Sequence, residues 1–231
     1  MNYFAHGRHA LRQPYLLAGT AVPDWLRVID RRLRVRAVQA APYVEDADPV
    51  VASVAQGIVR HHHDDGWFHA TQAFAEQSLA AAAAVRGLAP ADQSMRTWFV
   101  GHVLVELLLD AELYRRAPGE MDAYYGALHE VDPSLIADAV GRMAGCDAGK
   151  LARLIPGFLR ERFLPDYADD AKLAYRMGQV LRRVGLRPLP ESFVELLPEL
   201  RNNVAMRADE LLAHHTSPKR ERGTASCGDA A

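Results

Sequence analysis

Cysteine is nearly absent from this sequence, with two residues among 231. Cys146 and Cys227 can build neither a disulfide framework nor a cysteine-rich zinc site. No stretch approaches the roughly 20 apolar residues that a membrane-spanning helix needs, and the first residues lack the continuous apolar run of a signal peptide. These absences favour a cytoplasmic protein that has no membrane partner.

A basic excess is also missing, because 27 Lys and Arg residues face 29 Asp and Glu residues. Nucleic-acid-binding domains usually carry such an excess, so we expect no nucleic-acid partner. Hydrophobic residues make up 49% of the chain, which is typical of a globular protein. We predict one helical domain over residues 1–215. Residues 216–231 are small and charged without periodicity, which predicts a disordered tail.

Signals for β-strands are scarce, whereas apolar residues recur at helical spacing almost throughout. The sequence therefore predicts an all-α fold. Asp48 followed by Pro49 predicts a helix start, and Val51, Val54 and Ile58 form the apolar stripe of that helix. Further helices are predicted at about 92–116, 120–130, 133–144, 147–163, 168–185 and 191–214.

The segment GIVRHHHDDGWFHAT at 57–71 places four histidines and two aspartates within nine residues. If the helix from Pro49 continues through it, His61 and Asp65 extend the apolar stripe, and His69 follows one turn later. Histidine and carboxylate one turn apart can chelate a metal ion, which offsets the cost of burying them. If the helix ends near His63, the same residues form a solvated cap. The segment alone leaves both alternatives open.

A second polar series lies within WFVGHVLVELLLDAELYRR at 98–116, where His102, Glu106 and Asp110 follow one another at one-turn spacing. Apolar residues surround them on nearly every side, which is typical of a buried helix. A buried carboxylate needs a partner or a metal ion. The alternative is a structural pair of His102 with Glu106, or an ion pair to an arginine such as Arg8 or Arg60.

Four segments, taken in order, resemble the bacterial acyl carrier protein phosphodiesterase family: MNYFAH at 1–6, LLAGTAVPDW at 16–25, VAQGIVRHHHDD at 54–65 and GHVL at 101–104. That family is all-helical and distantly similar to HD-type phosphohydrolases, so the resemblance implies an HD-like multi-helix bundle. Its members release 4′-phosphopantetheine from holo acyl carrier protein with a divalent cation, usually manganese. The resemblance therefore implies a metal-dependent phosphodiesterase that has acyl carrier protein as its partner.

The motif residues of the family fall on His6, Asp24, His61, Asp65 and His102. The resemblance implies that Asp24, His61, Asp65 and His102 bind the metal ion, and that His6 orients a ligand or protonates the leaving oxygen. Mixed histidine and carboxylate ligands suit manganese, and they also suit iron or zinc.

The sequence departs from the family at four places, which hold His62, Asp64, Phe68-His69 and Gly101. Gly101 stands where the family has an aspartate before the motif histidine. Asp64, His69, Glu106 or Asp110 could replace that carboxylate or indicate a different substrate. Glu106 and Asp64 are the candidate general bases, being carboxylates near the proposed ligands.

Five arginines follow Asp24, at positions 27, 31, 32, 34 and 36. By resemblance, Arg27 and Arg31, with His62 and His69, are candidate substrate contacts, and the arginine run could dock an acidic carrier protein or its phosphate. A solvated arginine face is the alternative. Three functions stay open: the carrier-protein phosphodiesterase, another HD-like phosphohydrolase of a nucleotide or small phosphoester, and a non-catalytic helical binding or scaffold protein.

Overall fold

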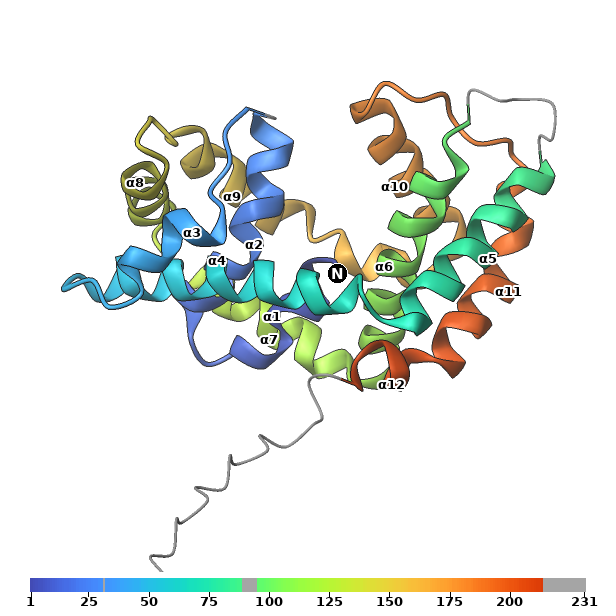
Figure 1. Cartoon of the computed structure of the whole chain (residues 1–231), viewed down its shortest axis with the longest axis horizontal. Coiled ribbons are helices and arrows are strands. Elements are labelled where there is room, and N and C mark those ends of the chain that lie inside the picture. The colour runs from blue at the N-terminus through green and yellow to red at the C-terminus, as the bar shows by residue number, and fades with distance from the viewer. Residues whose placement is uncertain (31, 89–94, 214–231) are drawn as a thin grey trace, which may run out of the picture.

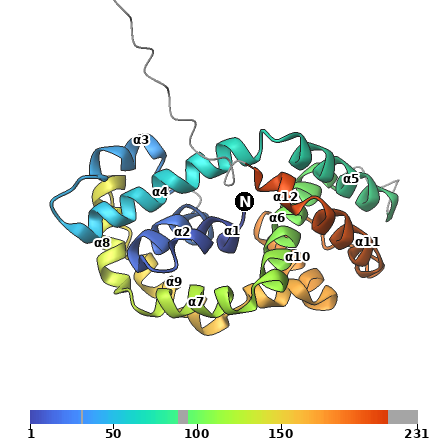
Figure 2. The ribbon, with the colours of Figure 1, turned by 90° about the horizontal axis from the view of Figure 1, so that it is seen from below.

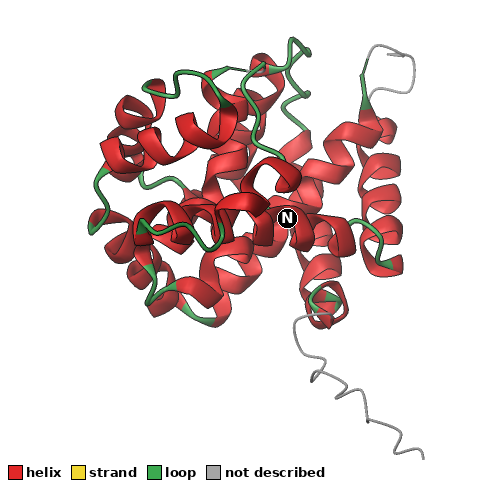
Figure 3. Ribbon diagram, turned by 60° about the vertical axis from the view of Figure 1, so that its left-hand side comes forward, coloured by secondary structure: helices red, strands yellow, loops and turns green. Residues whose placement is uncertain are grey.

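The computed structural model of this protein describes residues 1–30, 32–88 and 95–213. Over these ranges it holds twelve α-helices, three short 3₁₀ helices and no strand (Figure 3), which confirms the all-α prediction. The α-helices are α1 (Tyr3–Gly7), α2 (Pro14–Ile29), α3 (Ala37–Ala40), α4 (Pro49–Phe68), α5 (Gln72–Leu88), α6 (Thr97–Arg116), α7 (Pro118–His129), α8 (Pro133–Ala144), α9 (Lys150–Glu161), α10 (Asp170–Arg183), α11 (Phe193–Met206) and α12 (Ala208–Leu211). Arg31 and the predicted tail lie outside the described ranges.

Helix α4 begins at the predicted cap and continues past the histidine cluster. The Asp48 carboxylate accepts hydrogen bonds from the backbone N–H groups of Val50 (2.8 Å) and Val51 (3.4 Å), which satisfies donors that a helix start leaves unpaired. The helix runs to Phe68, and His69 forms its C-cap. The structure therefore decides between the two alternatives for residues 57–71, and His61 and Asp65 share one helical face with the apolar stripe.

The helices form two groups along the long axis of the molecule, and α4 runs along this axis (Figure 1). Helices α2, α3 and α8 pack on α4 itself, whereas α5, α6 and α11 form a second group beyond its C-terminal end. The N-terminus and α1 lie between these two groups, as the view from below also shows (Figure 2). The end of α4 therefore brings its polar residues to the junction of the two groups.

Two glycines let α2 and α4 approach closely. A Cβ atom added to Gly57 would lie 2.2 Å from the carbonyl oxygen of Leu16, and one added to Gly19 would lie 2.4 Å from that of Val54. No side chain fits at these distances, so backbone packs directly on backbone. The contact at Gly57 lies one turn of α4 before His61.

Helix α6 is buried on most of its surface, as its apolar sequence predicts. Val100, Leu104 and Leu108 are each 1% exposed or less. Gly101 packs against α5, where an added Cβ would lie 2.4 Å from the Ser78 carbonyl oxygen and 2.7 Å from the Ala82 nitrogen. The absence of a side chain at position 101 therefore allows the close α5–α6 contact.

Some predicted boundaries differ from the structure. Pro118 begins α7 instead of only ending the preceding helix, as its fixed φ suits a first helical position. The predicted helix at 191–214 is divided into α11 and α12, which meet at Arg207. The predicted helix at 147–163 ends at Glu161, because Arg162 adopts a left-handed conformation with φ of 40°.

Candidate metal centre

Helices α1 and α4 bring His6, His61 and Asp65 together in one group, where one ligand atom from each lies within 4.8 Å of the other two. His6 Nε2 is 3.2 Å from Asp65 Oδ1, and His61 Nε2 is 3.5 Å from Asp65 Oδ2. The two imidazole rings stack with centroids 4.1 Å apart. We call this group the inner triad. Its residue types and convergence suit a divalent metal ion.

The tautomer of His61 leaves Nε2 available as a ligand. Its Nδ1 lies 2.8 Å from the carbonyl oxygen of Thr20 on α2. A carbonyl only accepts, so Nδ1 carries the hydrogen and donates it. Burial, together with positive charge on His6, keeps the pKa of His61 well below its ordinary value. The ring is therefore neutral, and Nε2 presents a lone pair toward Asp65.

Buried imidazole nitrogens without hydrogen-bond partners gather in the inner triad. His6 is 0% and His61 1% exposed. Neither nitrogen of His6 has a hydrogen-bond partner, and neither does His61 Nε2. The large majority of buried side-chain polar atoms in proteins are paired, and leaving one unpaired costs about 1–3 kcal/mol. One bound cation would satisfy His61 Nε2 and one ring nitrogen of His6.

Asp64 lies behind His6 and away from the stripe of α4. Its Oδ2 is 3.8 Å from His6 Nδ1 and 3.6 Å from Arg60 Nε, and its Oδ1 accepts from Trp67 Nε1 at 3.4 Å. Burial lowers the pKa of His6, but the contacts with Asp64 and Asp65 raise it. The net pKa of His6 lies above its ordinary value. Asp64 is therefore placed to orient the His6 ring, whereas Asp65 faces the other ring nitrogen.

Asp24 projects from α2 near the inner triad without joining its cluster of ligand atoms. Burial raises the pKa of Asp24 to about 6, although the charge of His6 and of Arg27 acts in the opposite direction. Arg27, one turn further along α2, is 3.5 Å from Asp24 Oδ1 and more than half exposed. The predicted ligand Asp24 and the predicted substrate contact Arg27 thus lie together at one edge of the site.

The structure does not place the fourth predicted ligand, His102, in the inner triad. His102 lies with His69 and Glu106 in a second group whose ligand atoms also fall within 4.8 Å of one another. Glu106 Oε1 is 2.9 Å from His69 Nε2 and 3.3 Å from His102 Nε2. We call this group the outer triad, because His69 is 32% and His102 36% exposed. The prediction of a buried helix around His102 was therefore wrong on this side of α6.

The α-amino group of Met1 links the two triads. It donates to Asp65 Oδ1 at 2.7 Å and to Glu106 Oε1 at 3.2 Å. Burial alone would raise the pKa of both carboxylates. The ammonium and the neighbouring imidazoles lower it by more. They hold the pKa of Asp65 and of Glu106 well below the ordinary values.

Neither arginine suggested as a partner of Glu106 contacts it. Arg8 lies 3.7 Å from Glu120, and Arg60 pairs with Asp64. Asp110, the third member of the series on α6, has a structural contact instead. Its carboxylate accepts from the backbone nitrogens of Phe4 (3.0 Å) and Ala5 (2.8 Å), which caps the first turn of α1.

His62 holds the arginine-rich segment against α4. Its Nε2 lies 2.8 Å from the carbonyl oxygen of Val35, so it donates to that carbonyl and is engaged with the backbone. Arg32, Arg34 and Arg36 line one shallow hollow of this segment. Three of the five arginines named from the sequence therefore share one surface, whereas Arg27 lies on α2 beside Asp24 and Arg31 lies outside the described residues.

The backbone of α5 leaves no room for an aspartate at position 101, because its Cβ would lie 2.4 Å from the Ser78 carbonyl oxygen. Glu106, one turn after His102 on α6, places a carboxylate beside that histidine.

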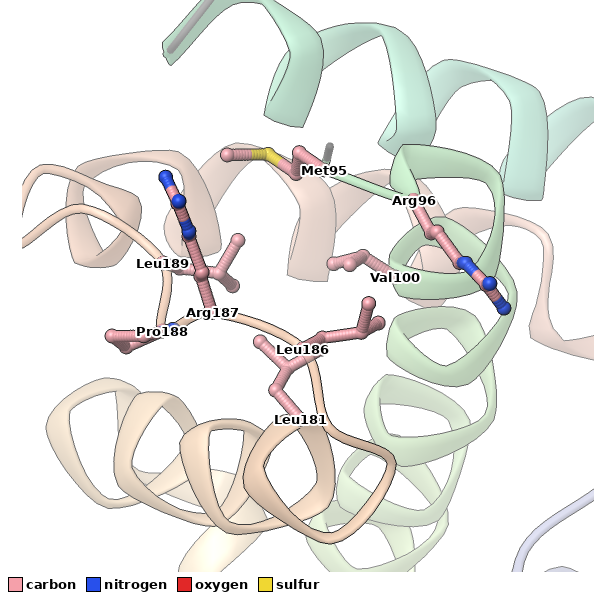
Figure 4. Close-up of a pocket in the computed structure, with 8 residues that line it drawn as sticks. All are labelled: Met95, Arg96, Val100, Leu181, Leu186, Arg187, Pro188 and Leu189. Carbon is pink, nitrogen blue, oxygen red and sulfur yellow. The ribbon is translucent and has the colours of Figure 1, made fainter. Parts of the chain in front are cut away.

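A small hollow between α6, the end of α10 and the following loop is separate from both triads (Figure 4). Leu181, Leu186, Leu189 and Val100 line it, and Arg96 and Arg187 flank it. Its accessible interior of about 10 Å³ holds no more than about one water molecule. It is therefore too small to bind a substrate.

Among the described helices, none combines the length and the apolar character required to cross a membrane. No protein-family model, no curated protein and no solved structure matches this chain.

Proposed function

We propose that this protein is a metal-dependent phosphodiester hydrolase, and that holo acyl carrier protein is its substrate. The inner triad carries the proposal, because a neutral buried His61 directs an unpaired Nε2 lone pair toward Asp65 and beside His6. Three protein ligands leave positions open for water, as in catalytic metal sites. Manganese, iron and zinc all accept this ligand set.

A bound divalent ion would lower the pKa of a water molecule and offset the charge of the phosphodiester. The protein residues have distinct roles around it. Thr20 fixes the His61 tautomer, Asp64 orients His6, and Arg27 at the exposed edge is placed to pair with a phosphate oxygen. In the hydrolysis, water oxygen bonds to phosphorus, the ester P–O bond breaks, and the water proton ends on the released alcohol.

The choice of substrate rests on the sequence resemblance and on the arginine surface. Arg32, Arg34 and Arg36 line one hollow, and His62 anchors their segment to the helix that bears His61 and Asp65. Complementary charge on an acidic carrier protein would orient it on this surface.

The test incubates the purified chain and Mn²⁺ with holo acyl carrier protein and follows 4′-phosphopantetheine release by mass spectrometry. We expect release by the wild type and only background release by His61→Ala, with His129→Ala on exposed α7 as the matched control. Cleavage of bis(p-nitrophenyl) phosphate without cleavage of the carrier protein would assign a small phosphoester instead. Metal binding without turnover of either substrate would overturn the hydrolase assignment.

A further inference from the structure

We propose that the outer triad of His69, His102 and Glu106 binds a second divalent cation beside the first, and that this outer ion is the one that faces the substrate. The second clause rests on the proposed hydrolase function, whereas the binding of the ion does not. The outer triad and the inner triad would then form one dinuclear centre at the junction of α4 and α6.

The composition of the outer triad suits a catalytic type of metal site. Two imidazoles and one carboxylate form the ligand set of several catalytic zinc and iron centres, in which the remaining positions take water or substrate. Their ligand atoms all lie within 4.8 Å of one another. Glu106 stands on a largely apolar helix, where positive charge such as the Met1 ammonium at 3.2 Å stabilises its carboxylate as an anion, the form that binds a metal ion.

The ring positions of the outer triad are held without a metal. The Phe74 ring lies 4.8 Å from the His69 ring and 4.8 Å from the His102 ring, measured between centroids. His69 is also fixed by its place as the C-cap of α4. Packing therefore limits the rotamers of both imidazoles, which lowers the entropic cost of ion binding.

The two triads are immediate neighbours. One ammonium nitrogen contacts both Asp65 and Glu106, so these carboxylates can be no farther apart than the sum of its two contact distances. His69 also follows Asp65 by one turn of α4. Each triad therefore contributes one carboxylate to a shared junction, where the two carboxylates lie on either side of this ammonium. In two-metal hydrolases a similar arrangement positions both the attacking and the leaving oxygen.

The two triads differ in their access to solvent. His6 and His61 are almost completely enclosed, whereas about a third of the His69 and His102 side chains is exposed. An ion in the inner triad would have few positions open to a large substrate. An ion in the outer triad would face solvent and could contact a phosphodiester directly.

The experiment measures Mn²⁺ stoichiometry by mass spectrometry and electron paramagnetic resonance on the full chain. It compares wild type, His102→Ala, Glu106→Gln and His61→Ala, with His129→Ala as the control. We expect two equivalents and a spin-coupled spectrum in wild type and control. His102→Ala and Glu106→Gln should retain one equivalent with the spectrum of an isolated ion. Circular dichroism identifies a variant that has lost its fold, and Glu106→Gln, which keeps the side-chain shape, then provides the decisive comparison.

The outcomes separate this inference from the proposed function. One equivalent in wild type that persists in His102→Ala and Glu106→Gln would overturn the second ion and leave the inner site standing. One equivalent lost in these variants but kept in His61→Ala would support the outer ion and overturn the inner site. If wild type binds two equivalents and His102→Ala binds one, but His102→Ala still cleaves the carrier protein at the wild-type rate, the second ion would be confirmed. Its contact with substrate would then be overturned. No bound metal in wild type would overturn both.

Discussion

At the scale of single residues, the direction of each nitrogen and oxygen lone pair decides what the site can do. His61 is informative because one ring nitrogen is committed to the Thr20 carbonyl, and the other has no hydrogen-bond partner. A structural histidine pairs both nitrogens or exposes one of them to water. The unpaired Nε2 of His61 is therefore available to bind a metal ion.

Asp64 provides a test at this scale. We expect Asp64→Asn to weaken Mn²⁺ binding about 10- to 100-fold, as for other partners that orient metal ligands, because it removes the charge 3.8 Å from His6 Nδ1. Isothermal titration calorimetry measures the affinity. Asp138→Asn, an exposed aspartate on α8, serves as the control. Equal affinities in the two variants would limit Asp64 to its contacts with Arg60 and Trp67.

At the scale of helices, the close contact of α2 and α4 determines the site. Thr20 reaches His61 only because Gly19 and Gly57 bring the two backbones together. A wider spacing would leave His61 Nδ1 without its acceptor and would free the ring to turn.

The prediction at this scale concerns two glycines of α4. We expect Gly57→Ala to lower the free energy of unfolding by about 1–3 kcal/mol, because its methyl group would overlap the α2 backbone. Gly66→Ala meets nothing within 4 Å and should raise stability by about 0.5–1 kcal/mol through its better helix propensity. Urea unfolding midpoints measure both. A Gly57→Ala variant as stable as wild type would show that the helices can move apart freely.

Local signals made several helices predictable. Helix α8 was predicted with its observed bounds, because Asp132 caps its start and Gly145 adopts the left-handed conformation at its end. Helix α2 has no side-chain cap at Gln13, so Pro14 at its first position is the local signal for its start.

The grouping of the site residues was only partly predictable. Spacing on one helix indicated that His61 and Asp65 share a face, and likewise His102 and Glu106. Which helices meet depends on packing between distant segments, so the sequence could not assign His102 to the outer triad. The hydrogen bond from His61 to the Thr20 carbonyl involves a main-chain atom, and no residue type signals it.

At the scale of the whole molecule, the charges at the junction of the two helical groups make stability depend on pH. The pKa of Glu106 in the folded protein lies below the ordinary value of 4.5. Its ionisation therefore contributes stability that is complete above that value and is lost as the pH falls toward the folded-state pKa. Asp65 acts in the same direction. Asp24, with its pKa raised to about 6, acts in the opposite direction between 3.8 and about 6.

We expect the metal-free protein to lose stability steeply between about pH 5 and pH 3, and Glu106→Gln to lose it less steeply, since it lacks one of the depressed groups. Urea midpoints across this range provide the measurement, with Glu120→Gln on α7 as the control. Parallel curves for wild type and Glu106→Gln would show that Glu106 has an ordinary pKa in the folded state.

The cap that Asp110 places on α1 has a consequence for the order of folding. Helix α1 has five residues, too few to persist alone in water. Its backbone is secured by a carboxylate more than a hundred positions later in the chain, and such distant contacts form late. We therefore expect His6 to reach Asp65 only after α4 and α6 have formed. A partly folded chain without His6 in place would have most of its helicity and almost no affinity for metal. The point at which the chain begins to bind metal would therefore mark the last step of folding.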